Sequence, residues 1–464
     1  MTLIKSISGI RGTIGGVQGD NLTPIDVVKF TTAYARLVAE RNAGKRIRIV
    51  VGRDARLSGE LVSNLVIGTL LSVGADVINV GLCTTPGTEM AVITKKADGG
   101  IIITASHNPR QWNALKLLNA QGEFLSDAEG KQVLAMAEEA AYNYPAIDGI
   151  GKVIEVSDFN DEHIRQVLAL PAVDVEAVRA RKFRVVVDAV NSVGGVVIPK
   201  LLRELGCEVV ELNCEPTGEF AHNPEPLKEH LTEISEVVVR EKADMGVVVD
   251  PDVDRLAFVM ENGEMFGEEY TLVAVAYYIL SQVKRGNTVS NLSSSRALRD
   301  VTLHCGGNYE AAAVGEVNVV AKMKETGAVI GGEGNGGVIY PELHYGRDAL
   351  VGVALFLTLL TRYGQPTLTQ LRATLPAYFA SKNKIQLTPA IDVDKVLREI
   401  KVRYFNENVN DIDGVKIDFA DCWVHLRKSN TEPIIRIYTE AQSQDEADRL
   451  AERFIAEIKA ICNL

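Results

Sequence analysis

Blocks with a helical spacing of apolar residues alternate with short β-branched runs along most of the chain. One helical block ends at residues 71–74, and a β-branched run at 76–80 follows it directly. A second such run, at 100–104, comes later. Helices that end at glycine and lead into β-branched strands are typical of βαβ units, whose strands run parallel. The pattern therefore predicts an α/β domain with a mixed, mostly parallel sheet.

The same plan occurs twice more. The second copy has a helical block at 201–206, a strand at 208–212 and a buried run at 245–250. A weaker third copy has strands at 310–314 and 327–331. We therefore expect three similar α/β domains.

The pattern changes after Pro366. Strands are predicted at 414–419, 423–426 and 434–438, followed by a helix from about 444 to 461. This order is typical of a smaller α+β domain. A chain of 464 residues is long enough for several hydrophobic cores. The expected domains lie at 1–152, 153–256, 257–368 and 369–464.

Composition excludes several classes of protein. With 61 acidic and 49 basic residues, the net charge of −12 argues against a general nucleic-acid binder. No apolar run approaches the ~20 residues of a membrane span, and residues 1–5 lack the layout of a signal peptide. We therefore expect a cytoplasmic protein without a membrane partner. The six cysteines show neither a CxxC pair nor a zinc-binding spacing, which favours reduced thiols.

Polar residues follow the last strand of each copy, at 104–109, 250–255 and 332–337. Ligands of open parallel sheets bind beyond the carboxyl ends of the strands. Since the three loops share this position in their domains, we expect them to face one cleft.

The first two loops carry candidate catalytic chemistry. Ser106 follows a buried strand, in the position of a nucleophile, and Pro109 restricts the loop. The second loop has carboxylates at alternating positions, Asp250, Asp252 and Asp254. This spacing can turn oxygen ligands toward one point, which suits a hard cation such as Mg²⁺. The alternatives are an ordinary turn and a solvated acidic turn.

Two further segments suit a sugar phosphate. Five of the seven residues at 331–337 are glycine, and Glu333 and Asn335 between them suit sugar hydroxyls, although a flexible turn is the alternative. The segment 427–433 combines two cations, two hydroxyls and an amide, which are the groups that a phosphate dianion needs. A charged turn is the alternative there.

These four loops, in this order, resemble the phosphoserine, magnesium, sugar-binding and phosphate-binding loops of the α-D-phosphohexomutase superfamily. Residues 8–12 and 52–56 also resemble family signatures, so the match covers essentially the whole chain. The resemblance implies three similar α/β domains and a C-terminal α+β domain related to the TATA-binding protein, around one central cleft. It also implies an isomerase that moves phosphate between O6 and O1 of a hexose.

By the same resemblance, Ser106 carries a phosphoryl group, which Mg²⁺ contacts together with Asp250, Asp252 and Asp254. The phosphoryl group passes to a hexose phosphate. The resulting hexose bisphosphate, both intermediate and activator, returns its other phosphoryl group to the serine. The residues expected to bind the substrate are Arg255, Glu333, Asn335, Arg427, Ser429, Asn430, Thr431 and Arg436.

The resemblance assigns proton transfer to Lys116, for which a phosphate-binding or merely solvated lysine is the alternative. Arg11 and His107 join it as expected catalytic residues. As a base, Lys116 needs a pKa well below its ordinary value, and Arg11 and Arg53 are the cations expected to lower it.

Two departures from the family pattern bear on function. Many members have a histidine where Gly337 stands and a serine where Asn335 stands. The roles of those side chains are therefore absent or moved, and His107 and His344 are the candidates to replace the histidine.

The sugar loop resembles that of an archaeal-type, phosphoglucosamine mutase-like branch. The expected reaction is therefore conversion of glucosamine 6-phosphate to glucosamine 1-phosphate. Phosphomannomutase or phosphoglucomutase activity is the main alternative; a magnesium-dependent sugar phosphatase and a non-catalytic sugar-phosphate binder are the others. The expected partner is a hexose phosphate, and the chain is expected to be a monomer or a homodimer.

Overall fold

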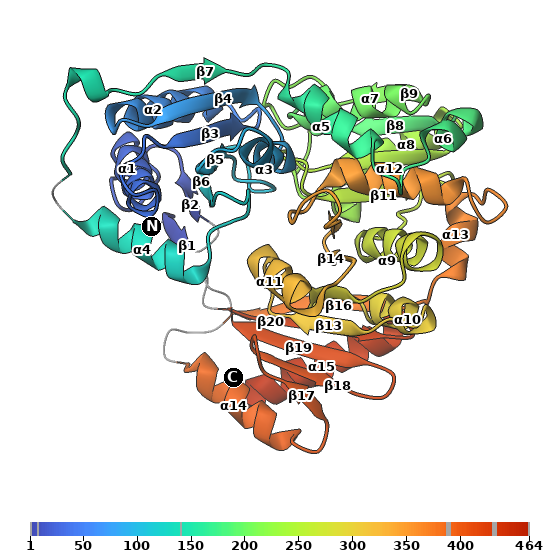
Figure 1. Cartoon of the computed structure of the whole chain (residues 1–464). Coiled ribbons are helices and arrows are strands. Elements are labelled where there is room, and N and C mark those ends of the chain that lie inside the picture. Colours follow the sequence, from blue (N-terminus) through green and yellow to red (C-terminus); the bar gives the residue numbers. More distant parts are fainter. Residues whose placement is uncertain (1, 7–8, 140–141, 387–390, 429–433, 463–464) are drawn as a thin grey trace. The chain divides into compact units, whose positions relative to one another are not determined.

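The computed structural model describes the chain apart from residues 1, 7–8, 140–141, 387–390, 429–433 and 463–464. Its contacts divide it into two compact units (Figure 1). Unit 1 consists of residues 1–271 and 335–371, and unit 2 consists of residues 272–334 and 372–464. The helices α9 (Glu268–Tyr278) and α13 (Leu368–Thr374) each run across a boundary between the two units.

A seven-stranded mixed sheet forms the N-terminal part of unit 1. Strand β3 lies between β4 and β5 and is parallel to both, whereas β6 is antiparallel to β5 and β2. In sheet order the strands are β1 (Ile4–Ser6), β2 (Gly9–Thr13), β6 (Trp112–Leu118), β5 (Gly99–Ile103), β3 (Arg48–Arg53), β4 (Asp76–Leu82) and β7 (Val153–Glu155). The helices of this part are α1 (Pro24–Arg41), α2 (Gly59–Ser72), α3 (Thr85–Thr94) and α4 (Asp127–Glu138).

Both faces of this sheet are buried. Ile101 and Ile103 belong to a core shared with α1, α2 and α4, whereas Ile102 belongs to a second core with α3. Successive residues of a strand point to opposite faces. A β-branched run without polar alternation is therefore what a strand covered on both sides requires, and the strand predicted near residue 100 is confirmed.

The second part of unit 1 is a four-stranded sheet in the order β11 (Leu256–Met260), β10 (Met245–Val249), β8 (Arg184–Asp188) and β9 (Glu208–Leu212). Strands β8, β9 and β10 are parallel, and β11 returns antiparallel to β10. The accompanying helices are α5 (Phe159–Leu168), α6 (Val175–Arg181), α7 (Gly194–Glu204) and α8 (Thr232–Arg240), with short turns of helix at Ile147–Gly149 and Lys228–His230.

Strand β15 (Gly337–Ile339) and helix α12 (Ala349–Leu360) complete unit 1. All twelve residues of α12 are buried, and Phe356 stacks on Phe258 of β11 with ring centroids 4.0 Å apart. Such a helix is apolar on every side because it is covered on every side. Among the helices of the described residues, none has the length and apolar character that a membrane crossing requires.

Unit 2 begins with three parallel strands, in the order β13 (Tyr309–Ala312), β12 (Thr288–Asn291) and β14 (Ile330–Glu333), and the helices α10 (Arg296–His304) and α11 (Glu316–Thr326). The five-residue π-helical turn Ile279–Val283 precedes them. Two details of the sequence prediction are wrong here: β12 was not predicted, and β14 reaches Glu333, inside the expected glycine loop. Glycine fits this strand at position 331, since a Cβ there would lie 2.6 Å from both the Met323 sulfur and the Val289 carbonyl oxygen.

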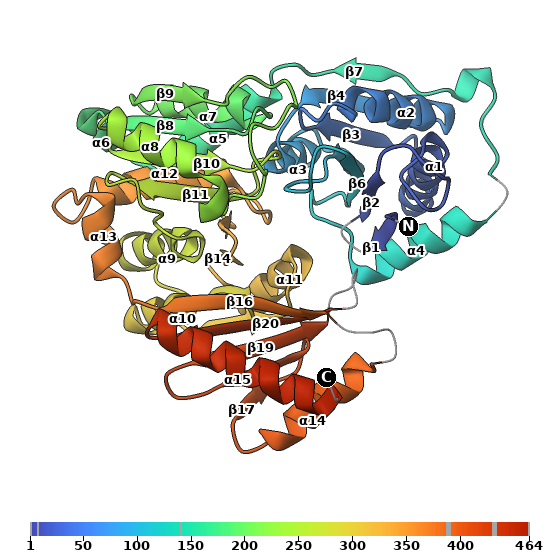
Figure 2. The same ribbon diagram turned by 180° about the vertical axis from the view of Figure 1, so that it is seen from behind.

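The C-terminal part of unit 2 is a five-stranded antiparallel sheet (Figure 2). Its strands, in order, are β16 (Phe379–Gln386), β20 (Ile434–Ala441), β19 (Trp423–Lys428), β18 (Val415–Asp418) and β17 (Asn408–Asn410). Helix α15 (Gln444–Cys462) packs on β16 and β20, and α14 (Val393–Arg403) packs on β18 and β19. The predicted α+β plan is confirmed, but β16 and β17 were not predicted, since β16 alternates exposed polar residues with few buried ones.

Candidate active site

Ser106 lies in the loop that follows β5, with its backbone in the left-handed region at φ 49°. Its residue is 8% exposed, and its hydroxyl donates a hydrogen bond to Asp250 Oδ2 at 2.7 Å. The backbone N–H of Ser106 donates to the hydroxyl of Thr104 at 2.9 Å, and that hydroxyl donates to Asp54 at 2.6 Å. The loop therefore presents Ser106 to the acidic loop of the next sheet.

One buried guanidinium holds the serine loop in this shape. Arg56 donates to the carbonyl oxygens of Asn108 and Pro109 at 3.0 and 3.1 Å, and also to the carbonyl oxygen of Ser106. Its Nε lies 3.0 Å from Asp54 Oδ2, and neither side chain is exposed. Burial raises the pKa of the Asp54 carboxyl, and Arg56 opposes that rise. Because water reaches neither partner, each depends on the other for its charge balance.

Removal of this guanidinium should therefore be costly. For Arg56→Met we expect unit 1 to lose about 3–5 kcal/mol of stability, because a buried carboxylate is left without its partner. The loss should appear as an earlier first transition in urea unfolding, together with a fall in any activity that depends on Ser106. Arg36→Met, which removes a surface ion pair with Glu40, is the control and should leave the transition nearly unchanged. An unchanged transition for Arg56→Met would contradict this account of the loop.

Three carboxylates follow β10 and are fully buried, Asp250, Asp252 and Asp254. Their oxygens lie within 4.8 Å of one another. Val253 between them adopts φ 65°, an unusual conformation for a β-branched residue that turns the chain sharply. The backbone N–H of Arg255 donates to Asp250 Oδ1 at 3.1 Å. The loop thus turns its three acidic side chains toward one place.

The carboxylates have unequal environments. Burial, then the neighbouring charges of Asp252 and Asp254, raise the pKa of Asp250 well above its ordinary value. Burial alone would also raise the pKa of Asp252, but Lys116 at 2.7 Å and the Thr85 hydroxyl at 2.5 Å hold it well below its usual range. Three acids at such separations resist joint ionisation unless a cation lies among them.

The acidic loop has unused ligand atoms. Asp252 Oδ1 and Asp254 Oδ1 are buried and accept no hydrogen bond from the described residues. Buried carboxylate oxygens without donors are unfavourable, and hard divalent cations bind carboxylate oxygens of this kind. The residues present therefore fit a magnesium ion, with Ser106 adjacent to one of its ligands.

Lys116 of β6 contacts two of the three carboxylates of the acidic loop. Its amine lies 2.7 Å from Asp252 Oδ2 and 3.5 Å from Asp254 Oδ2. Burial lowers the pKa of Lys116, but these two carboxylates outweigh it and raise the pKa above the ordinary value. The expected lowering is therefore wrong, because the neighbours that decide the pKa are two anions from another sheet.

His107 and Arg255 lie beside the serine. The His107 Nδ1 atom is 3.4 Å from the Ser106 hydroxyl. Burial, and then the charge of Arg255, lower the pKa of His107 well below its ordinary value, so the ring is neutral. Arg11 of β2 also contributes to this lowering. Arg255 itself lies 3.4 Å from Glu225.

His344, the other candidate to replace the missing histidine, contacts Asp348 and Glu89. Arg347 is the residue that the sequence argument missed. Its guanidinium lies 2.7 Å from Asp254 Oδ2, and a Cβ built on Gly337 would lie 2.3 Å from its Cδ atom. Arg347 therefore fills the space beside Gly337 that a side chain would need. The Gly337 departure was the only signal in the sequence that pointed to such a neighbour.

The remaining predicted substrate residues are distributed between the units. In unit 1, Asn335 Oδ1 accepts from the backbone N–H of Gly337 at 3.3 Å. In unit 2, Glu333 ends β14 and accepts from Asn291 at 2.8 Å. Arg427 pairs with Arg436 across β19 and β20. Ser429, Asn430 and Thr431 lie outside the described residues.

Comparison with known proteins gives one consistent family. Models of phosphoglucomutase/phosphomannomutase match over the alpha/beta/alpha domains I, II and III and the C-terminal domain, at residues 4–143, 161–263, 267–378 and 383–457. A phosphoglucomutase/phosphomannomutase of Thermococcus kodakarensis is 37% identical over 443 residues, which are 94% of this chain and 95% of that protein.

Two further relatives agree with this. The "Probable phosphoglucosamine mutase" of Methanopyrus kandleri is 32% identical and covers 97% of this chain and 96% of its own length. A crystal structure of a phosphoglucomutase/phosphomannomutase family protein from Burkholderia thailandensis has a TM-score of 0.85 and 26% identity, and the match covers 99% of this chain and 98% of that one. The chain therefore belongs to the phosphoglucomutase/phosphomannomutase family of the α-D-phosphohexomutase superfamily, and it is an isomerase, a phosphohexomutase.

Proposed function

We propose that the protein interconverts glucosamine 6-phosphate and glucosamine 1-phosphate and that Ser106 carries the phosphoryl group. The observation that carries the proposal is the 2.7 Å hydrogen bond from Ser106 to Asp250, beside two buried carboxylates with unused oxygens. A nucleophile next to a divalent-cation site is the arrangement that phosphoryl transfer requires.

In the proposed reaction, a hydroxyl of the hexose phosphate attacks the phosphorus of phosphoserine, and the bond from phosphorus to Ser106 Oγ breaks. Overall, one proton passes from that hydroxyl to Ser106 Oγ: Lys116 gives its proton to Oγ and takes up the proton of the hydroxyl. A hexose bisphosphate results, and its other phosphoryl group returns to Ser106 by the reverse steps. Mg²⁺ bound by Asp250, Asp252 and Asp254 would offset the negative charge of the phosphoryl oxygens.

We assign Lys116 the role of a charged donor in this reaction. Its amine contacts Asp252 and Asp254, and those carboxylates raise its pKa. A protonated amine can deliver a proton to Ser106 Oγ as the phosphoryl group leaves, and its charge favours the transition state. His107, whose ring is neutral, and Arg11 are proposed to orient the serine side of the site.

The residues of the other loops are proposed to hold the substrate. Arg427 and Arg436, paired on neighbouring strands, offer two cations to the phosphate that is not reacting. Ser429, Asn430 and Thr431 are proposed to add donors to it. The other proposed contacts are Arg255 for a phosphate and Glu333 and Asn335 for the sugar.

The choice of an amino sugar rests on Glu333 and on the relatives. A carboxylate that is 4% exposed at the end of a strand suits an ammonium group at C2 as well as a hydroxyl. Relatives named probable phosphoglucosamine mutase support the first reading. The 37% identical phosphoglucomutase/phosphomannomutase supports mannose or glucose phosphate as the second candidate substrate.

A comparison of three substrates tests the proposal. With excess Mg²⁺ and a matched hexose bisphosphate activator, we expect kcat/KM for glucosamine 6-phosphate to exceed that for glucose or mannose 6-phosphate by about tenfold or more. Glu333→Gln should reduce that ratio, because it removes the charge and keeps the hydrogen-bonding shape. A wild-type preference for mannose or glucose phosphate would replace the glucosamine assignment, and steady release of inorganic phosphate would indicate a phosphatase.

Arg347 is proposed to supply a fixed positive charge beside the acidic loop, where many members have a histidine. For Arg347→Met we expect kcat to fall by about 10²-fold, because a fixed charge beside the acidic loop is lost. Gly337→Ala should have a similar effect, since its Cβ would displace the Arg347 side chain. Arg362→Met, which removes a surface ion pair with Asp174, is the control. Wild-type kcat in Arg347→Met would contradict this role.

We also propose a cytoplasmic location and a monomeric or homodimeric state, with a hexose phosphate as the small-molecule partner. Sedimentation of the purified chain at assay concentrations measures the oligomeric state directly.

A further inference from the structure

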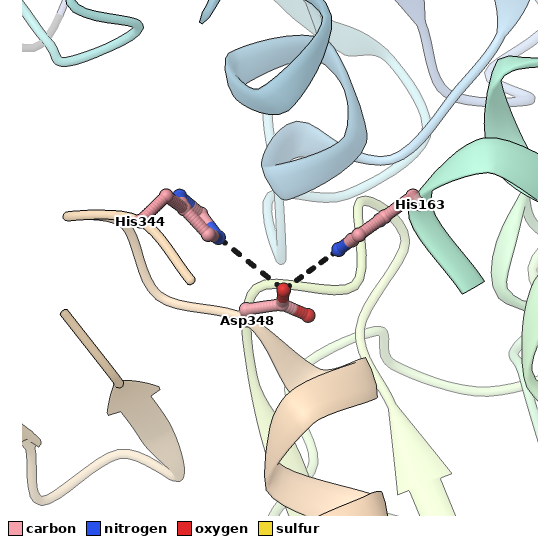
Figure 3. A group of neighbouring side chains, drawn as sticks. All are labelled: His163, His344 and Asp348. Carbon is pink, nitrogen blue, oxygen red and sulfur yellow. Dashed lines mark hydrogen bonds and ion pairs between the residues drawn. The ribbon is translucent and has the colours of Figure 1, made fainter. Parts of the chain in front are cut away.

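A second group of buried polar side chains lies in unit 1 (Figure 3). His163 comes from α5, whereas His344 and Asp348 come from the segment that leads into α12. The Nε2 atoms of His163 and His344 lie 2.8 and 3.2 Å from the same oxygen, Asp348 Oδ2. Glu89 of α3 faces the other nitrogen of His344, with Oε2 at 3.4 Å from Nδ1. None of the four residues is more than 5% exposed.

The ring of His344 lies between two carboxylates. Its Nε2 atom faces Asp348, and its Nδ1 atom faces Glu89 and makes no hydrogen bond with the described residues. The second oxygen of Asp348 is already used, because Oδ1 accepts from the backbone N–H groups of Leu350 and Val351 at the start of α12. Asp348 Oδ2 is therefore the oxygen on which the two imidazoles converge.

The three converging atoms are of the kinds that bind a divalent cation. Two imidazole nitrogens meet one carboxylate oxygen, and all three side chains are buried. One cation between them would contact all three atoms at once.

We propose that His163 Nε2, His344 Nε2 and Asp348 Oδ2 bind one divalent cation of the zinc class. The three ligand atoms lie within 4.8 Å of one another, and zinc binds imidazole nitrogen and carboxylate oxygen at about 2.0–2.2 Å. Two imidazoles disfavour magnesium, which prefers oxygen ligands. With the metal on Nε2, the hydrogen of His344 is on Nδ1 and points at Glu89, the usual arrangement that orients a histidine ligand.

The position of this site suggests a structural role. Its ligands and Glu89 come from three segments that are far apart in the sequence, at 85–94, 159–168 and 344–348. Thr85, at the start of α3, contacts Asp252, and Arg347 contacts Asp254. A cation here would hold in place the two segments that contact the acidic loop, the start of α3 and residues 344–348. The proposal is independent of the sugar that the enzyme uses.

Metal binding by the full chain tests the proposal. After removal of metals by a chelator, the wild-type protein is titrated with Zn²⁺ or Co²⁺ in excess Mg²⁺, which occupies the oxygen site. We expect one equivalent of tightly bound zinc and a higher midpoint of thermal unfolding. Bound Co²⁺ should absorb visible light with the strength that is typical of tetrahedral coordination. Asp252→Asn should keep this absorption, which separates the site from the acidic loop.

His163→Gln and His344→Gln are the matched variants. A glutamine amide can still donate a hydrogen bond to Asp348, so these variants should fold if hydrogen bonds alone hold the group. If the group binds a metal, the variants should lose the Co²⁺ absorption. Absence of stoichiometric zinc and of the Co²⁺ absorption in the wild-type chain would overturn the proposal and leave a hydrogen-bonded group only. Because that result needs no variant, it holds even where a variant fails to fold.

Discussion

Ser106→Ala is expected to lose mutase activity by on the order of 10⁴-fold or more, since the group proposed to accept and return the phosphoryl is removed. The fold should remain, because the loop is held by Arg56 through backbone carbonyl oxygens and not through the serine side chain. A coupled assay with a hexose bisphosphate activator measures the loss, and circular dichroism checks the fold.

Intact mass completes this experiment. The wild-type chain incubated with hexose bisphosphate should gain one phosphoryl group, mapped to Ser106, and the alanine variant should gain none. Ser72→Ala, which removes an exposed hydroxyl bonded to Gly68, is the matched control and should behave as the wild type. Substantial turnover by Ser106→Ala would refute the phosphoserine mechanism.

Asp252→Asn is expected to lower kcat by on the order of 10³-fold, because the change removes the charge of a proposed metal ligand. Added Mg²⁺ should no longer restore activity. The same substitution removes the nearest anion of Lys116, at 2.7 Å, so the pKa of Lys116 should fall. Activity measured against Mg²⁺ concentration, at several pH values, follows both effects.

The control for this variant is Asp161→Asn, which removes a carboxylate that pairs with Lys200 near the surface. It should keep the wild-type dependence on Mg²⁺. If Asp252→Asn kept a wild-type Mg²⁺ response, the acidic loop would not be the catalytic metal site.

Local sequence was sufficient to predict the elements that carry the chemistry. The strand before Ser106 and the strand before Asp250 are continuous apolar runs followed at once by polar residues, and both were found where expected. Such signals depend only on burial of a strand on both faces. Neighbours in sequence were enough to find them.

Contacts between distant segments could not be predicted in this way. The pKa of Lys116 depends on two carboxylates more than 130 positions away in the sequence, and the direction expected from Arg11 and Arg53 was wrong. The pairing of His163 with Asp348 likewise joins segments 185 positions apart in the sequence. The end of β14 was misassigned because what Gly331 avoids, Met323 and Val289, lies on other elements.

The left-handed backbone at Ser106 has a consequence for which amino acid can serve there. A β-branched side chain adds strain at φ 49°, although this fold holds Val190 at the same φ. Threonine, which has the same hydroxyl, would therefore add backbone strain at this position. The main chain thus favours serine over threonine as the proposed phosphoryl carrier, before any contact with metal or sugar is made.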